Sequence, residues 1–526
     1  MKITNPSSLW KDYDAAALPI CEYALSEKSV NGFSVKEYYF DGLYAADGKV
    51  RAFISITEHP ESKGVIIYMP NRNGVVGDEV PQELVSRGYT VAVLDYIGKA
   101  EDNARFTLYP KSLSDCNCYG VKEFTAPQDA LTSCWYVWTC LARRAKLLLD
   151  KLYPGMHIFA LGNGLGGSTV YKLSTFNDGF TACATMLNVL PTMRGSGNHL
   201  INYRAALDNT AYASLGKVPM MMTIASNDED KMFDEMSELV AETVSLKSFR
   251  IIERAFSSGI SLTYDQIDHF FTAIATGGKL PPKPRIKPVN SNNKLYYNID
   301  IDDSESCTEI KSANFYCAFR IDNPMHRNWT NVSLVSLGNN QYMAHVFVLD
   351  SNKPIYTFIN ITDENGDISS SELVTLIPKT LGLVAQQPNS ARRRLIYESE
   401  MGKDLWTSPK GGNVNAESGP FGINGVTSDR NSLATFKPGD LLYKTDDDSF
   451  LQLIISGKKQ KLTISVFDET DKYSCEVELS GDEWNKFTLK SSDMMSSVHH
   501  LEYWSKIVLL MIEGCDKFLI SSVIWV

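Results

Sequence analysis

Alternating strand and helix signals in roughly the first 285 residues limit the fold more than any other feature of the chain. Four short runs, at 65–69, 90–94, 158–161 and 220–224, are continuously apolar or nearly so. Such runs are typical of parallel strands that helices cover on both faces. Helical patterns lie between and after them, at 79–87, 127–152, 230–243 and 263–276. The alternation predicts a doubly wound α/β unit with a mostly parallel sheet.

The pattern changes after a proline-rich, basic stretch at 279–285, which we interpret as a linker. Residues 315–321 and 355–361 then alternate with a period of two, as half-buried strands do. Turn signals at 337–340 and 364–367 separate these runs. About 100 residues of this kind predict an immunoglobulin-like β-sandwich.

A polar, glycine-rich segment at 408–424 lies near the start of a third unit. Apolar runs follow, and we expect strands at 450–456, 462–467, 487–489, 507–512 and 518–526. This organisation predicts a jelly-roll-like β-sandwich. Because 526 residues exceed what one core accommodates, we expect three domains, at 1–285, 286–385 and 386–526.

Composition excludes several classes of function. The formal net charge of −11 argues against a nucleic-acid partner, which rewards basic surfaces. No run of 18 apolar residues exists, so we expect neither a spanning helix nor a membrane partner. The N-terminus lacks an apolar signal region, which predicts a cytoplasmic protein, although a secreted chain trimmed of its signal would look the same.

The ten cysteines are thinly spread, and only Cys116 and Cys118 lie close together in sequence. A zinc site would need a second such pair, so we expect buried thiols, no metal and no cofactor. Trp135, Trp138, Leu141 and Ala145 recur at helical spacing. Such a stripe is more often core packing than a cofactor site.

The motif that carries chemistry is Gly162-Asn163-Gly164-Leu165-Gly166-Gly167, between the expected strand at 158–161 and a helix. Strand, tight glycine-rich turn and helix are the context of a hydrolase nucleophile elbow. Gly164 occupies the nucleophile position and offers no hydroxyl or thiol, so no acyl-enzyme can form there. Ser168, one helical turn later, is expected to point away from the apex.

The acid and histidine of a catalytic triad would follow the elbow in that order. Asp228, just after the 220–224 run, has the place of the acid, and it could equally cap the next helix. His269 lies near the end of the unit but inside an expected helix, so it is either the triad histidine or an ordinary helix-face residue. The loop at 256–262, where such a histidine usually lies, contains none.

Backbone amides would form an oxyanion hole even without a nucleophile. We expect one donor from Leu165 and one from the loop Asn71-Arg72-Asn73-Gly74. The glycines of the elbow also match a phosphate-binding loop, but only loosely, because the Gly-Lys-Ser/Thr ending is missing.

With these motifs, the first 280 or so residues resemble the dienelactone hydrolase and acetyl xylan esterase-like branch of the α/β-hydrolase superfamily. The resemblance rests on residues 84–96, on 135–138, on the elbow and on 225–228. The region with Trp329 and 350–356 looks like a β-sandwich appended to some members. The family's elbow usually carries serine and its last loop a histidine; this chain departs at Gly164 and in that loop, and matches at Asp228.

The C-terminal sandwich resembles carbohydrate-binding jelly rolls around residues 483–489. Trp406, Tyr443, Trp484 and Trp504 are candidates for stacking on sugars, and each could instead be core. Asp446-Asp447-Asp448 could ligate calcium or form a solvated turn.

Three functional hypotheses remain open from the sequence. The first is a catalytically degenerate hydrolase that binds a small-molecule or carbohydrate ligand without turning it over. The second is a carbohydrate-directed esterase whose serine was replaced by Gly164. The third is a glycan-binding protein that uses its α/β unit as a scaffold.

Overall fold

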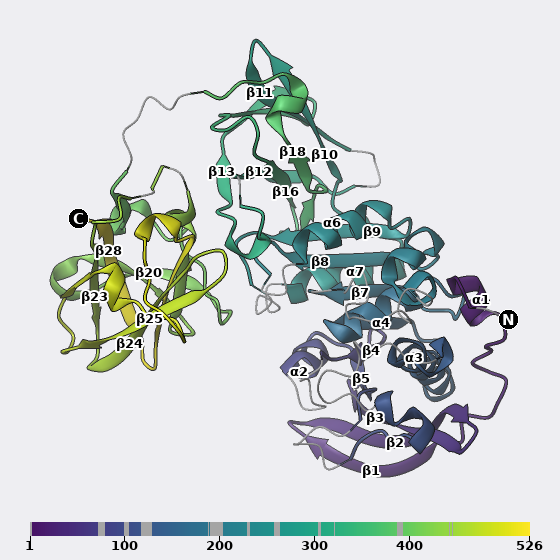
Figure 1. Cartoon of the computed structure of the whole chain (residues 1–526). Helices are drawn as coiled ribbons and strands as arrows, with labels where there is room; N and C mark the ends of the chain where they lie inside the picture. Colours follow the sequence, from purple (N-terminus) through teal and green to yellow (C-terminus); the bar gives the residue numbers. More distant parts are fainter. Residues whose placement is uncertain are drawn as a thin grey trace.

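The computed structural model describes residues 3–71, 79–98, 105–116, 129–187, 189, 204–228, 232–256, 263–302, 307–319, 321–386, 393–440, 442–443 and 445–526. Its sheets fall into three groups along the chain, visible as three bodies in Figure 1. We name them the α/β unit (strands β1 to β9), the first sandwich (β10 to β18) and the second sandwich (β19 to β28). No helix among the described residues is both long and apolar enough to cross a membrane.

A nine-stranded mixed sheet forms the centre of the α/β unit, in the order β1-β2-β3-β5-β4-β6-β7-β8-β9. Strands β1, β2, β3 and β5 pair antiparallel, and every pair from β5 across to β9 is parallel. The four predicted apolar runs are β4, β5, β6 and β8. The bounds are β1 (Tyr23–Val30), β2 (Phe33–Ala45), β3 (Gly48–Glu58), β4 (Val65–Met69), β5 (Thr90–Asp95), β6 (Ile158–Asn163), β7 (Ala182–Met186), β8 (Met220–Ala225) and β9 (Leu246–Ile252).

Helices cover both faces of this sheet, which confirms the doubly wound prediction. Helices α2 and α7 pack on one face, and α1, α3, α4 and α6 pack on the other. Their bounds are α1 (Pro6–Trp10), α2 (Glu79–Ser86), α3 (Cys134–Leu152), α4 (Leu165–Leu173), α6 (Phe233–Glu242) and α7 (Tyr264–Thr276). Two of them begin later than predicted. Ser133 accepts the N–H of Tyr136 and caps α3, and α6 begins at Phe233.

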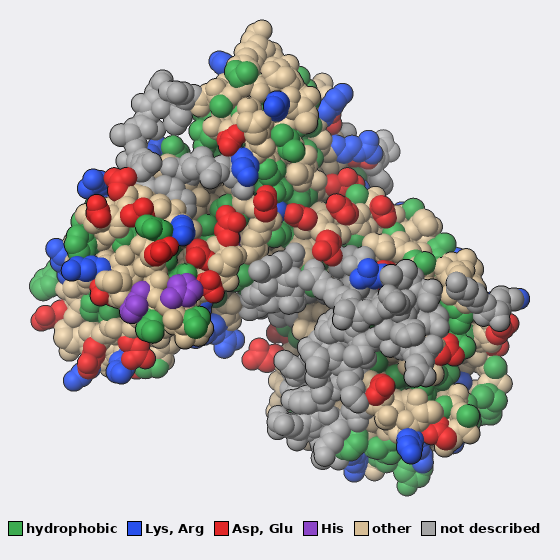
Figure 2. Space-filling view, in the orientation of Figure 1, with side chains coloured by type: hydrophobic (Ala, Val, Ile, Leu, Met, Phe, Trp, Pro, Cys, Tyr) green, Lys and Arg blue, Asp and Glu red, His purple; other side chains and the backbone are tan. Residues whose placement is uncertain are grey.

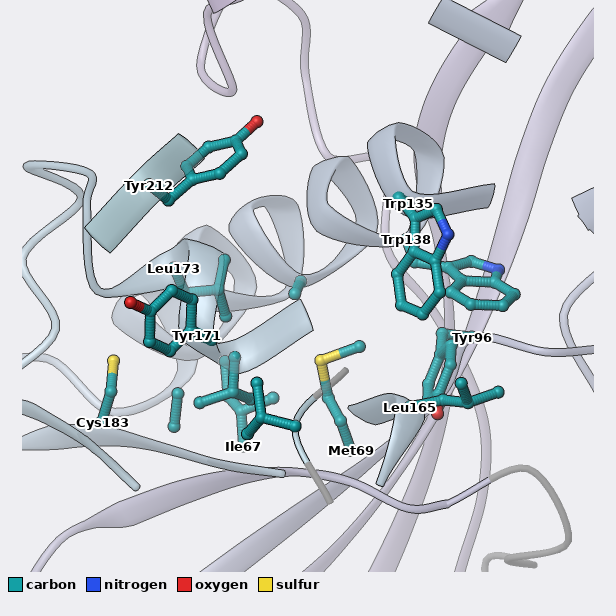
Figure 3. Close-up of a cluster of buried hydrophobic side chains, with 14 of the residues drawn as sticks. Ile67, Met69, Tyr96, Trp135, Trp138, Leu165, Tyr171, Leu173, Cys183 and Tyr212 are labelled. Carbon is teal, nitrogen blue, oxygen red and sulfur yellow. The ribbon is translucent and has the colours of Figure 1, made fainter. Parts of the chain in front are cut away.

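The aromatic stripe of α3 lies in the core, as predicted. Figure 3 shows Trp135 and Trp138 close to Tyr96, above Met69 of β4. The two indole rings meet edge to face at 5.3 Å between centroids, and Trp138 meets Tyr96 in the same way at 5.0 Å. Edge-to-face aromatic pairs stabilise a core beyond their buried area. They also fix α3 against the strands that lead into the elbow.

The first sandwich has two antiparallel sheets with a buried apolar layer between them. Strands β10, β11, β15 and β14 form one sheet, and β13, β12, β16, β17 and β18 form the other. The bounds are β10 (Pro284–Ser291), β11 (Lys294–Ile301), β12 (Ile310–Phe319), β13 (Thr330–Val332), β14 (Leu334–Gly338), β15 (Gln341–Val346), β16 (Ile355–Asp363), β17 (Ile368–Ser370) and β18 (Val374–Leu376). The predicted linker is shorter than expected, because β10 already begins at Pro284.

The second sandwich repeats this two-sheet plan around a separate core. Strands β20, β21, β28, β23, β26 and β19 form one sheet, and β22, β27, β24 and β25 form the other. The bounds are β19 (Leu395–Glu398), β20 (Val414–Ser418), β21 (Asn424–Ser428), β22 (Ser432–Thr435), β23 (Leu451–Gly457), β24 (Gln460–Phe467), β25 (Lys472–Leu479), β26 (Asn485–Leu489), β27 (Leu509–Gly514) and β28 (Phe518–Trp525).

Buried contacts join the first sandwich to the α/β unit. Arg327 is fully buried and forms a two-pronged ion pair with Asp234 of α6, at 2.5 and 2.6 Å. Its guanidinium also lies 3.4 Å from the ring centroid of Tyr356. At the edge strand β9, the N–H of Ile251 donates to Ser370 Oγ at 2.7 Å, and Asn360 Nδ2 donates to the Ile251 carbonyl at 3.1 Å. Side chains of the sandwich thus bond the backbone of this edge.

The second sandwich also contacts the α/β unit directly. Phe256, which follows β9, stacks on Phe436 at 5.8 Å between ring centroids. Ala434, Leu509 and Met511 of the second sandwich complete this small buried cluster. The carboxyl ends of β8 and β9, where ligands bind in open α/β sheets, therefore lie close to both sandwiches.

Candidate functional site

The expected elbow is present, with the backbone shape that such a turn requires. Strand β6 ends at Asn163, helix α4 begins at Leu165, and Gly164 joins them with φ +52° and ψ −115°. A positive φ of this kind is costly for residues that carry a Cβ, and glycine adopts it freely. Gly166 permits the close approach of β4, because a Cβ there would lie 2.0 Å from the Met69 carbonyl oxygen.

The space that a nucleophilic side chain would need at position 164 is filled by Asn71. A Cβ built on Gly164 would lie 2.2 Å from Asn71 Oδ1 and 2.4 Å from its Cγ. Contacts so short do not occur in folded proteins, so a serine here would require the Asn71 side chain to move. The apex of the elbow therefore lacks a nucleophile, and a side chain there would displace the exposed Asn71 side chain.

Asn71 also engages the predicted oxyanion donor. Its Oδ1 accepts a hydrogen bond from the backbone N–H of Leu165 at 3.2 Å. In an active hydrolase this N–H would bind the oxygen that becomes negative in the tetrahedral intermediate. The carboxamide carbonyl of Asn71 thus takes the place of a substrate carbonyl. The remaining residues of the predicted oxyanion loop, Arg72, Asn73 and Gly74, lie outside the described residues.

Ser168 does not substitute for the missing nucleophile. Its side chain is buried, and its Oγ lies 3.4 Å from the Gly164 carbonyl oxygen, one turn back along α4. A serine that bonds to the carbonyl four residues earlier points along its own helix. The expectation that Ser168 points away from the apex is confirmed.

Asp228 lies where the acid was expected, directly after β8, and is 1% exposed. Its Oδ2 accepts the N–H of Met232 at 3.3 Å, which caps the turn that leads into α6. The neighbouring Asn227 donates from Nδ2 to the carbonyls of Met325 and Arg327, at 3.0 and 2.8 Å. The turn that would present the acid is thus fastened to the first sandwich.

His269 is directed at the first sandwich. Its Nδ1 lies 2.9 Å from Oδ1 of Asp367, in the turn between β16 and β17. Burial raises the pKa of the Asp367 carboxyl, and the nearby His269 ring partly offsets this. The structure therefore gives His269 a carboxylate partner other than Asp228, and with it a role in joining two units.

The other described histidines of the α/β unit bond elsewhere. His59 Nδ1 accepts the N–H of Glu61, and His157 pairs with the Thr181 hydroxyl just before β6 begins. His157 thus lies at the end of β6 opposite to Gly164, since it precedes the first residue of that strand. The structure therefore joins neither His157 nor His269, the predicted triad histidine, to the elbow.

Asp95, at the carboxyl end of β5, is a buried titratable group that the sequence patterns did not single out. Burial raises its pKa to about 7. Its carboxylate accepts the N–H of Thr107 at 2.6 Å and the N–H of Gly98 at 3.0 Å. A carboxyl held by two backbone donors from one loop acts as a structural tie.

The predicted sugar-stacking tryptophans separate into two groups. Trp406 and Trp504 are 4% and 1% exposed and lie in the core of the second sandwich, so stacking a sugar on them is excluded in this structure. Tyr443 is buried as well, at 7% exposure. Trp484 is partly exposed, and its Nε1 donates to the Pro420 carbonyl at 2.9 Å. Only Trp484, of these four, has surface to offer a ligand.

The candidate metal ligands are accounted for within the described part of the chain, where no group of three or more histidine, cysteine and acidic residues comes together. Asp447 accepts the hydroxyl of Ser505 at 2.7 Å, as a side chain in a surface turn does. Cys116 is buried, and Cys118 lies outside the described residues.

No family model and no curated protein sequence matches the chain. Among solved structures, it is similar to an acetyl xylan esterase from Paenibacillus sp. R4, with 15% identity, 52% of this chain and 96% of that chain covered, and a TM-score of 0.37. It is also similar to acetyl xylan esterase 1 from Thermoanaerobacterium sp. JW/SL YS485, with 11% identity, 52% of this chain and 95% of that chain covered, and a TM-score of 0.39. A third similar structure is a dienelactone hydrolase from Anabaena variabilis ATCC 29413, with 11% identity, 45% of this chain and 97% of that chain covered, and a TM-score of 0.31.

Proposed function

We propose that the chain is a non-hydrolytic binding protein whose α/β-hydrolase-like unit has lost ester hydrolysis. The observation that carries the proposal is the Asn71 side chain, which fills the nucleophile space and accepts the Leu165 N–H. Gly164 supplies no nucleophile, and His269 pairs with Asp367. An acyl-transfer site needs a nucleophile, a base and a free oxyanion donor together.

The α/β unit then serves two purposes. It is the scaffold on which an immunoglobulin-like and a jelly-roll-like sandwich are mounted, with domains at 1–285, 286–385 and 386–526. Its elbow keeps a backbone donor that a carbonyl or carboxylate ligand can reach when the Asn71 side chain rotates away. The ligand class we favour is a carbohydrate or an acyl ester that is bound and released unchanged.

The test compares the wild-type chain with Gly164→Ser and with Gly164→Ser combined with Asn71→Ala. Each is assayed for hydrolysis of p-nitrophenyl acetate and for labelling by a fluorophosphonate, which reacts with activated serines. We expect background rates and no labelling in all three, because none of the histidines of the α/β unit that the structure describes is placed to activate the serine. Gly164→Ala serves as the matched control without a hydroxyl.

One outcome favours the second hypothesis, a carbohydrate-directed esterase with a replaced serine. If Gly164→Ser alone hydrolyses the ester well above Gly164→Ala, the elbow retains an intact base and the site is degenerate only at position 164. Turnover by the wild-type chain would reject a non-hydrolytic function altogether. The retained φ and ψ of Gly164 are the observation in favour of this alternative.

A further inference from the structure

A cleft of about 400 Å³ lies between the two sandwiches, away from the elbow. Its lining includes Phe319 and Asn328 from the first sandwich, and Asp440 and Asp468 from the second. Binding pockets for small molecules span roughly 300–1,000 Å³ and occur preferentially where domains meet. In both size and location, this cleft has the properties of a ligand site.

Part of the cleft lining is apolar. It includes the partly exposed Phe319 and Leu349 and the buried Ile321 and Val508. Gly439 allows the close approach of the sandwiches, because a Cβ at that position would lie 3.2 Å from Cδ1 of Ile321. An apolar lining that includes an aromatic ring suits the hydrophobic face of a ring-shaped ligand.

Two carboxylates line the walls and are fixed by neutral donors. Asp468 Oδ1 accepts the N–H groups of Thr470 and Asp471, at 2.8 and 2.7 Å. Asp440 Oδ1 accepts the N–H of Leu442 at 2.9 Å. Burial raises the pKa of Asp440, and Asn328, from the opposite sandwich, hydrogen-bonds to its side chain. Both carboxyl groups are therefore held in place as acceptors for the hydroxyl groups of a ligand.

The charged groups that line the cleft are mostly acidic. Asp440, Asp468 and the exposed Glu469 line it, together with Lys506, which lies 3.5 Å from Glu502 outside the cleft. Lys437 and Arg393 lie near Asp440 and partly offset its charge. Figure 2 shows further acidic side chains along the junction of the first sandwich and the α/β unit. A phosphate or carboxylate ligand would meet repulsion here, whereas hydroxyl groups would find acceptors.

We propose that the cleft between the sandwiches binds a neutral saccharide of one or two rings. The apolar face of the sugar lies on Phe319, and its hydroxyl groups donate to Asp440 and Asp468. Asn328 supplies a side-chain amide that both donates and accepts. This site goes beyond the proposed function of the elbow and does not depend on it, because it shares no residue with the elbow.

The test uses the full chain and isothermal titration calorimetry with D-xylose, D-glucose, N-acetyl-D-glucosamine and their β-1,4-linked disaccharides. Spermidine is the cationic probe, since carboxylates could also attract an amine. Glu469→Trp fills the mouth of the cleft, and Asp468→Asn keeps an oxygen for the backbone donors while removing the charge. Glu400→Trp, at an exposed glutamate outside the cleft lining, is the matched control.

We expect at least one saccharide to bind, and both cleft variants to weaken it about tenfold or more, a loss of about 1.4 kcal/mol. Glu400→Trp should bind like wild type, and all variants should melt within about 2 °C of it. Three results would overturn the proposal: no binding across the panel, binding of spermidine in preference to every sugar, or saccharide binding that survives both cleft variants and is lost in Trp484→Ala.

Discussion

The side-chain oxygen of Asn71 lies 3.2 Å from the backbone nitrogen of Leu165, at the point where a hydrolase would bind its substrate's carbonyl. One side chain thereby fills the space of a nucleophile and occupies an oxyanion donor. The glycine at position 164 thus has a neighbour, 93 positions earlier in the chain, that fills the space beside it.

Gly164→Ser should destabilise the chain through two separable effects. The positive φ costs a residue with a Cβ about 1–2 kcal/mol, and the clash adds a smaller cost, because the exposed Asn71 side chain must rotate away. Gly155→Ser is the control, because Gly155 has φ +78° and open space around its Cβ position. Thermal unfolding should show a larger loss of stability for Gly164→Ser than for Gly155→Ser. Adding Asn71→Ala to Gly164→Ser should reduce the difference between the two losses. Equal losses at both glycines would rule out the clash.

Arg327→Ala should be among the most damaging single changes at the junction of the units. It removes a fully buried guanidinium that binds Asp234 and lies against Tyr356. Losing its charged hydrogen bonds and buried packing should cost about 2–4 kcal/mol, less than for a fully buried pair because Asp234 is 38% exposed. Lys461→Ala breaks an exposed pair with Glu476 and should change stability little, because solvent screens both charges. Calorimetry checks both, and similar losses would show that Arg327 contributes no more than a surface ion pair.

Asp95 should make stability depend on pH. Burial raises its pKa from an ordinary 3.8 to about 7, so the folded protein favours the protonated form. The stabilisation from this group is full below pH 3.8 and is lost as the pH rises through about 7. As the pH rises from 4.5 to 8.5, the melting temperature of wild type should therefore decrease relative to that of Asp95→Asn.

The exposed Asp47 provides the control for that experiment. Hydrogen bonds from Ser112 lower the pKa of Asp47, so this group changes stability only in more acidic solution. The difference in melting temperature between wild type and Asp47→Asn should stay constant from pH 4.5 to 8.5. If the melting temperature of wild type relative to Asp95→Asn also stayed constant over this range, the Asp95 carboxyl of the folded wild-type chain would be ionised throughout.

Trp504→Ala and Trp484→Ala should differ sharply in stability. Trp504 is buried beside Trp525, with ring centroids 5.3 Å apart, and its removal should cost about 3–5 kcal/mol. Trp484 is partly exposed, so Trp484→Ala should lower the stability clearly less than Trp504→Ala does. Denaturant titration followed by far-ultraviolet circular dichroism measures both. A larger loss at Trp484 would assign that indole to the core as well.

The core of the α/β unit could be predicted from local pattern. The apolar runs that became β4, β5, β6 and β8 are buried along almost their whole length, so periodicity and length alone identified them. The antiparallel extension β1 to β3 was not anticipated. Its burial is mixed, as in β1, where most residues are exposed, and such strands leave a weak apolar signal.

The candidate site could be predicted only in part. The elbow followed from glycine spacing, because local backbone geometry dictates it. The roles of Asn71 and His269 did not, since each depends on a partner about 100 positions away, Leu165 and Asp367. Trp406 and Trp504 were candidates for sugar stacking because residue type alone does not tell a buried indole from an exposed one.

Strand β9 ends the central sheet, yet Ser370 and Asn360 of the first sandwich bond both backbone groups of Ile251. An uncovered sheet edge is a template for pairing with other chains. A nascent chain whose sandwiches have not yet left the ribosome would present this edge unprotected. The order of synthesis therefore exposes the β9 edge before the residues that cover it have been made.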